Sequence, residues 1–140
     1  MTEKYKILGQ FIKDLSSETK DVETYLHVRD NISKYKLDIN IYSKALKNKI
    51  IEINTVLKFE DKEETKFKSF FEMVYTTIIQ LNEEIENKIE LEKIILCDVQ
   101  LKISSDLEKS FLDLLRNSGY SNINFEKKID FEELYKKRIN

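Results

Sequence analysis

The stretch that decides the fold runs from Phe67 to Leu81, FKSFFEMVYTTIIQL. Successive side chains of a β-strand point to opposite faces, so odd-numbered residues share one face and even-numbered residues the other. Apolar residues occur on both, with Phe71 and Met73 on one face and Phe70 and Val74 on the other. A strand with one solvated face would alternate apolar with polar residues, so we expect both faces to be covered. The chain's own helices can cover one face, and the other needs another subunit or a bound partner.

A single acid, Glu72, lies inside this otherwise apolar run. An acid at an exposed strand end would need no explanation, whereas an acid within an apolar strand is a candidate contact for a partner. The residues alone leave both interpretations open.

The composition fits one domain spanning residues 1–140. The chain has 24 Lys and Arg against 26 Asp and Glu, so its net charge of −2 gives no electrostatic case for nucleic acid. Two Gly and no Pro exclude a glycine-rich phosphate-binding loop and argue against an enzyme site built on loops.

The cysteine count and the N-terminus indicate a cytoplasmic protein. Cys97 is the only cysteine, so no intrachain disulfide can form, which suits a reducing compartment. The first ten residues, MTEKYKILGQ, lack the apolar core of a signal peptide. No apolar run approaches the ~20 residues that span a bilayer, so we expect no direct membrane insertion.

Three further segments have the pattern of β-strands. They are Tyr5–Glu18, Lys34–Ser43 and Ile50–Phe59. In the first, alternation predicts Phe11 and Leu15 on one face and Leu8 and Ile12 on the other. The polar segment Thr19–Ser33 is predicted to be a long connection with at most a short strand. The charged run Glu60–Glu64 is a predicted hairpin turn, which makes the strands on either side of it antiparallel neighbours.

After Leu81 the apolar spacing becomes helical. The repeat is formed by Leu91, Ile95, Ile103, Leu107, Phe111 and Leu114. Asp98 and the pair Ser104-Ser105 are candidate positions for a bend, and Gly119 suits a left-handed helix end. A shorter helix is predicted to begin at Asp130, a good N-cap. Strands followed by helices predict an α+β fold, with helices on one face of an antiparallel sheet.

No constellation for catalysis or metal binding is evident in the sequence. His27 is the only histidine, so a metal site would lack further imidazole ligands, and a Cys97–His27 pair is formally possible but Cys97 lies in an apolar run. The adjacent acid pairs Glu83-Glu84 and Glu132-Glu133 point apart on a helix, whereas acid–base carboxylates must converge. We therefore predict a protein that is not an enzyme and uses neither cofactor nor metal.

Several motifs, in order along the chain, resemble those of the bacterial SecB protein-export chaperones. Near the start, Phe11–Glu18 (FIKDLSSE) is similar to the family's opening strand, and near the end Ile129–Tyr135 (IDFEELY) is similar to its Ile-Asp-Phe-x-x-Leu-Tyr motif. Between them, Phe70–Met73 resembles an apolar-apolar-Glu-Val stretch. Leu96-Cys97 falls at a Cys-Pro of the family's long helix, and Asn117–Tyr120 at the turn after that helix.

The resemblance implies a four-stranded antiparallel sheet followed by one long and one short helix, and a homotetramer built as a dimer of dimers. The implied function is an ATP-independent holdase that binds unfolded secretory preproteins and delivers them to the SecA motor. Two alternatives remain. One is a SecB-like chaperone dedicated to another client, such as an antitoxin, and the other is a small-molecule-binding or enzymatic α+β domain.

The resemblance also implies roles for individual residues. Asp14, Glu18, Phe70 and Glu72 would belong to the surface that docks SecA. Phe71, Met73 and Tyr75 would form the face that assembles dimers into tetramers. Phe11, Phe131, Leu134 and Tyr135 would line a client groove, although the spacing of the last three is also that of an ordinary buried helix face.

Overall fold

A computed structural model of the chain describes residues 4–83 and 85–121. The elements in chain order are β1 (Tyr5–Glu18), α1 (Val22–Asn31), a 3₁₀ turn (Ile32–Lys34), β2 (Lys36–Ala45), β3 (Ile50–Glu60), β4 (Phe70–Leu81), α2 (Lys88–Lys93), a π-helical segment (Ile94–Asp98) and α3 (Val99–Asn117). The predicted helix from Asp130, with Phe131, Leu134 and Tyr135, lies outside the described residues.

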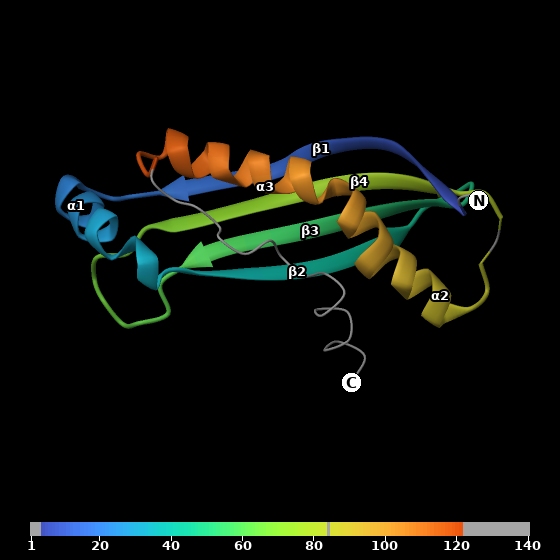
Figure 1. Cartoon of the computed structure of the whole chain (residues 1–140), viewed down its shortest axis with the longest axis horizontal. Helices are drawn as coiled ribbons and strands as arrows, with labels where there is room; N and C mark the ends of the chain where they lie inside the picture. Colours follow the sequence, from blue (N-terminus) through green and yellow to red (C-terminus); the bar gives the residue numbers. More distant parts are fainter. Residues whose placement is uncertain (1–3, 84, 122–140) are drawn as a thin grey trace.

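The strands form one four-stranded antiparallel sheet in the order β1-β4-β3-β2. The predicted central strand, β4, is an inner strand between β1 and β3, and it begins at Phe70 rather than Phe67. The connection after β3 makes β3 and β4 antiparallel neighbours, as the charged run Glu60–Glu64 predicts. β1 and β2 are the two edges of the sheet (Figure 1).

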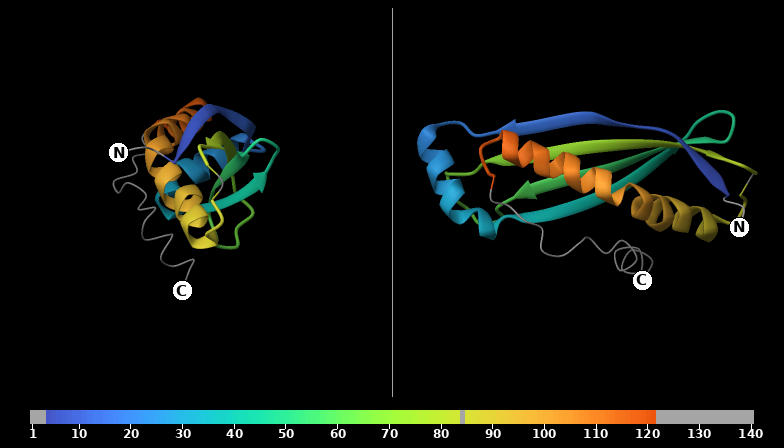
Figure 2. Two further views of the ribbon diagram at one scale, coloured as in Figure 1. Left: turned by 90° about the vertical axis from the view of Figure 1, so that its right-hand side faces the viewer. Right: turned by 45° about the horizontal axis from the view of Figure 1, so that its top comes forward.

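The helices α2 and α3 lie across one face of this sheet, as the end-on view in Figure 2 shows. The odd-numbered face of β4 packs beneath α3, and aromatic rings fill the layer between them. Phe71 lies 5.5 Å from the Tyr120 ring and 6.2 Å from the Phe59 ring, which in turn lies 6.2 Å from Phe111 of α3. This aromatic layer is part of the single core of the described residues.

β1 contains two bulges, which changes the faces predicted for its apolar residues. The register shifts between Ile7 and Gly9 and again between Ile12 and Asp14. Phe11 pairs with an even-numbered residue of β4 and Leu15 with an odd-numbered one, so the prediction that they share a face is wrong. The extra residue of each bulge breaks the two-residue alternation on which that prediction depended.

The segment predicted as a connection, Thr19–Ser33, contains the helix α1. Asp21 caps it, because its carboxylate accepts a hydrogen bond from the Thr24 backbone N–H (2.8 Å). The Thr24 hydroxyl, and then this backbone bond, lower the pKa of Asp21. Asp21 was the signal available in the sequence. The apolar stripe that would have identified the helix is weak, since Thr24 and Val28 are its only buried residues.

The long helical region is continuous but changes its winding at the π-helical segment, which ends at Asp98. The predicted bend near Asp98 is therefore confirmed, whereas Ser104 and Ser105 lie within regular helix. The fully buried Gln100 follows the segment, and its side-chain oxygen accepts a hydrogen bond from the Thr55 hydroxyl (3.0 Å). This bond ties the start of α3 to the centre of the sheet.

Gly119 ends α3 in the left-handed conformation, with φ of +102°. The Tyr120 N–H bonds back to the Leu115 carbonyl (2.9 Å), and the Tyr25 hydroxyl donates to the Gly119 carbonyl (2.8 Å). A Cβ at position 119 would lie 2.7 Å from the Tyr25 ring. The turn thus needs glycine both for its backbone and for the close approach of α1.

We expect Gly119→Ala to lower the free energy of unfolding by about 1–3 kcal/mol, because the left-handed backbone and the Tyr25 ring both oppose a Cβ. Urea denaturation followed by circular dichroism measures the change. Gly9→Ala is the matched control, since a Cβ there meets nothing within 4 Å. Equal stability of the two variants would contradict the role of this turn.

Candidate functional site

The sheet face opposite α3, called the open face below, is covered by no element of the described residues. Strand pairing defines its members. They are Phe11, Asp14, Ser16 and Glu18 of β1; Phe70, Glu72, Val74, Thr76 and Ile78 of β4; Glu52, Asn54, Val56 and Lys58 of β3; and Lys36, Asp38, Asn40, Tyr42 and Lys44 of β2. This is the second face that the apolar pattern of β4 predicts to need a partner.

The four residues predicted to dock SecA lie together at one end of the open face. Glu18 pairs with Phe70 across the β1–β4 ladder, Ser16 pairs with Glu72, and Asp14 pairs with Val74. Asp14 and Glu18 therefore flank Glu72 on the same face, and Glu18 lies opposite the half-buried Phe70. No ion pair involves these three acids within residues 4–83 and 85–121, although Lys58 lies opposite Glu72 on β3. The arrangement is an apolar contact with negative charge beside it.

A ladder of hydrogen bonds that the sequence does not predict crosses the middle of the same face. The Thr76 hydroxyl donates to Asn54 Oδ1 (2.7 Å), Asn54 Nδ2 donates to Glu52 Oε2 (2.8 Å), and Lys13 Nζ contacts the same carboxylate oxygen (3.0 Å). The hydrogen bond from Asn54, and then that from Lys13, hold the pKa of the Glu52 carboxyl below its usual range. The signal in the sequence was the pair Glu52 and Asn54, two polar residues that alternate with apolar ones in β3.

The edge strand β1 exposes apolar side chains along its whole length. Leu8, Phe11, Ile12 and Leu15 have relative exposures of 43–48%. No strand of the described chain pairs with the outer side of β1, so its backbone N–H and C=O groups on that side are available as well (Figure 1). A long edge strand with exposed apolar residues is a template for pairing with another chain.

The structure places Phe71, Met73 and Tyr75 in the core of the protomer, beneath α3. Phe71 and Met73 are fully buried and Tyr75 is 7% exposed. They therefore cannot form a surface that contacts a second subunit directly, and that part of the prediction is corrected. The reason is that α3 covers the odd-numbered face of β4, and the uncovered face carries the even-numbered residues.

Of the predicted client-groove residues, Phe11 alone is described, and it lies on the open face opposite Thr76. Phe11 is thus on the same face as the acidic end. The other three residues of that prediction, Phe131, Leu134 and Tyr135, lie outside the described residues.

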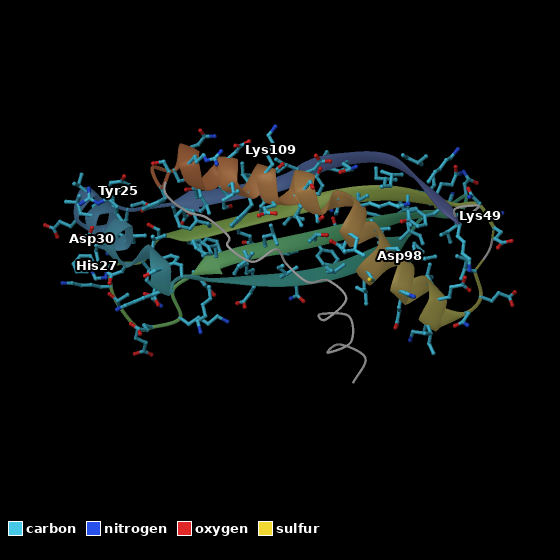
Figure 3. The ribbon with its side chains drawn as sticks, in the orientation of Figure 1. Tyr25, His27, Asp30, Lys49, Asp98 and Lys109 are labelled. Carbon is cyan, nitrogen blue, oxygen red and sulfur yellow. The ribbon has the colours of Figure 1, made fainter. Side chains whose placement is uncertain are left out.

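His27 and Cys97 do not form a pair. The ring of His27, a residue of α1, lies 5.2 Å from the ring of Phe67. Cys97 is buried in the π-helical segment. Figure 3 labels His27 and Asp98, the neighbour of Cys97, at well-separated places along the molecule. In the part of the chain that the structure describes, no group of three or more potential metal ligands occurs and no helix is long and apolar enough to cross a bilayer.

The chain matches known proteins along its whole length. The family model described as preprotein translocase subunit SecB matches residues 1–140. The putative protein-export protein SecB of Pelagibacter ubique is 61% identical over 140 residues, which is all of both chains. The solved SecB-like chaperone of Mycobacterium tuberculosis, in complex with a ChAD peptide from the HigA1 antitoxin, has the same fold. Its TM-score is 0.64 at 9% identity, covering 89% of this chain and 90% of that one.

These matches confirm the predicted SecB-like α+β fold. The family match confirms the prediction of a cytoplasmic protein-export chaperone rather than an enzyme. The resemblance carried by the motifs at Phe11–Glu18 and Ile129–Tyr135 extends over the full length, and the chain belongs to the SecB family.

Proposed function

We propose that this chain is an ATP-independent holdase that binds non-native secretory preproteins. We also propose that its 140 residues form a single domain. Membership of the SecB family and the unpaired outer edge of β2 support the holdase proposal. An unfolded preprotein offers extended backbone and apolar side chains, and the edge strand β2 offers unpaired backbone groups along its outer side and the exposed side chain of Tyr42. A folded protein offers neither, so capture selects chains that have not yet folded.

A refolding assay without ATP tests the holdase function. A denatured secretory precursor is diluted into buffer with and without the purified chain, and its refolding and light scattering are followed. We expect slower refolding and less aggregation, to an extent that rises with the amount of the chain added. Identical curves with and without the chain would contradict the proposal.

We further propose that the chain assembles into a homotetramer, as a dimer of dimers. Pairing of the β1 edge with the β1 edge of a second copy is supported by its length of 14 residues and its exposed apolar side chains. Antiparallel pairing of one strand with its own copy is self-complementary, as a two-fold symmetric interface requires. In this proposal Phe71, Met73 and Tyr75 act on assembly indirectly, because they hold α3 in place from below.

The acidic end of the open face is the proposed docking surface for SecA. It presents Asp14, Glu18 and Glu72 on one face, with Phe70 at its end opposite Glu18, which suits a partner segment with positive charges beside an apolar residue. The strength of such a contact depends on salt, because the acids are at the protein surface.

We expect Glu72→Lys to weaken SecA binding about tenfold or more at low salt, because a repulsive charge replaces an attractive one at the centre of the acidic end. Isothermal titration calorimetry with purified SecA measures the change. Glu86→Lys, which makes the same charge reversal in the connection before α2, is the control and should bind as the parent does. Unchanged SecA affinity of Glu72→Lys, with the preprotein assay intact, would rule out this docking surface.

A chaperone dedicated to an antitoxin is the alternative that SecA binding separates from the export holdase. The M. tuberculosis protein is solved with an antitoxin peptide, but at 9% identity that likeness shows the fold alone. A small-molecule-binding function has less support, since His27 and Cys97 lie in different parts of the described structure.

A further inference from the structure

We propose that Glu52 is a second anionic contact for the basic segment that docks on the open face, and that Lys13 occupies this contact as an internal cation until the partner replaces it. The proposal rests on the SecA docking surface proposed above and extends it along the sheet. Its partner is an extended polypeptide segment with two cationic positions and apolar residues between them.

The position of Glu52 on the open face sets the spacing of those two cations. Glu52 of β3 lies opposite Ile78 of β4, so Ile78 gives the position of Glu52 along β4. Glu72, at the acidic end, is also in β4. These two β4 residues are six positions apart, which at ~3.3 Å per residue corresponds to about 20 Å. Val74 and Val56, which pair with each other, lie between the two acidic positions. An extended segment of about six residues therefore reaches from one to the other, over the Val74–Val56 pair and the Thr76–Asn54 pair.

The Glu52 carboxylate is held in place before any partner arrives. Asn54 and Thr76 are fully buried, although no element of the described chain covers this face. Their hydrogen bonds, from Thr76 to Asn54 (2.7 Å) and from Asn54 to Glu52 (2.8 Å), fix one carboxylate oxygen. A contact that is already ordered loses less conformational entropy on binding than a free surface glutamate would.

Lys13 is the residue that the partner would displace. It is the extra residue of the second β1 bulge, and its side chain is 47% exposed, whereas that of Glu52 is 24% exposed. An ion pair this accessible to water contributes little to stability. Replacing Lys13 by a cation of the partner therefore costs little free energy. An arginine of the partner could bond the carboxylate with two N–H groups, which the Lys13 ammonium does not do.

The test compares two variants of one ion pair in SecA binding, measured by calorimetry at low salt. We expect Glu52→Gln to weaken binding about two- to fivefold and Lys13→Gln to strengthen it by a similar factor, because the first removes the contact and the second removes its competitor. A role in protein stability alone would shift both variants in the same direction. Glutamine at position 52 keeps an acceptor for Asn54, so the ladder remains intact.

A third variant tests the ladder without changing any charge. Thr76→Val removes the hydroxyl that orients Asn54, and we expect it to weaken SecA binding in the same direction as Glu52→Gln. Glu86→Gln and Lys109→Gln are controls for loss of one negative or one positive charge away from the open face. Lys109 is on α3, and Figure 3 shows it projecting away from the sheet. Both controls should bind SecA as the parent does.

Synthetic peptides test the spacing. One peptide carries two arginines about six residues apart, and the other has the same composition with the arginines adjacent. The parent should prefer the spaced peptide, and Glu52→Gln should remove that preference. If Glu72→Lys weakens SecA binding but the Glu52 and Lys13 variants change nothing or move together, this inference is wrong and the docking surface stands. If none of the open-face variants affects SecA, the docking surface itself is wrong.

Discussion

Phe71→Ala is expected to lower the free energy of unfolding by about 3–5 kcal/mol, which is enough to unfold a marginal domain. Phe71 is fully buried, and its ring contacts Tyr35, Phe59 and Tyr120. The substitution removes the apolar surface of the ring and leaves a cavity in the middle of the aromatic layer. Urea denaturation followed by circular dichroism gives the difference from the parent.

The adjacent residue provides the control. Phe70 is on the opposite face of the same strand and is only half-buried, so Phe70→Ala should lower the free energy of unfolding by about 1 kcal/mol. Similar losses at the two positions would contradict the assignment of faces. By the same reasoning Met73→Asp, which places an unpaired charge in the core, should prevent folding of the protomer rather than release dimers from a tetramer.

Leu15→Lys is expected to abolish self-association while leaving the protomer folded. Leu15 is on the edge strand with a relative exposure of 47%, so the protomer has little reason to reject a lysine there. In a β1–β1 interface, however, the ammonium would be buried without a partner, and natural sheets use lysine in this way to block edge pairing. Multi-angle light scattering should report a single protomer's mass for the variant.

Leu26→Lys is the matched control for this change. Leu26 is on α1 with a relative exposure of 42%, and α1 is not part of the proposed interface. We expect the control to keep the mass of the parent assembly. An unaltered mass for Leu15→Lys, with normal unfolding behaviour, would show that β1 does not hold the subunits together.

Strand positions could be predicted from the sequence because alternation and turn residues are local signals. β1 was predicted with its observed bounds, and β3 within one residue, because apolar residues alternate there between polar flanks. The helix α1 was missed because its stability comes from two buried residues and its contact with Tyr120 rather than from an amphipathic stripe. The bulges of β1 have no composition signal, and each one reverses the faces that follow it.

The candidate site was only partly visible in the sequence. The acidic end was found through the SecB resemblance, because Asp14 and Glu18 are unremarkable surface acids until β1 pairs with β4 and brings them to Glu72. The ladder from Thr76 to Glu52 was missed because it joins residues of different strands, and the pairing of those strands is not a local property.

The apolar residues on both faces of β4 are enough to predict that the chain's own helices cover one face and that the other needs a partner. The family, too, follows from the sequence, through motifs spread over the whole chain. Which face α3 covers follows from the packing of the folded chain, because apolar alternation is similar on the two faces of β4. In the structure the helix buries the face with Phe71 and Met73. That choice leaves Glu72 and Glu52 on the same uncovered surface, where pairing between distant strands brings them into one site.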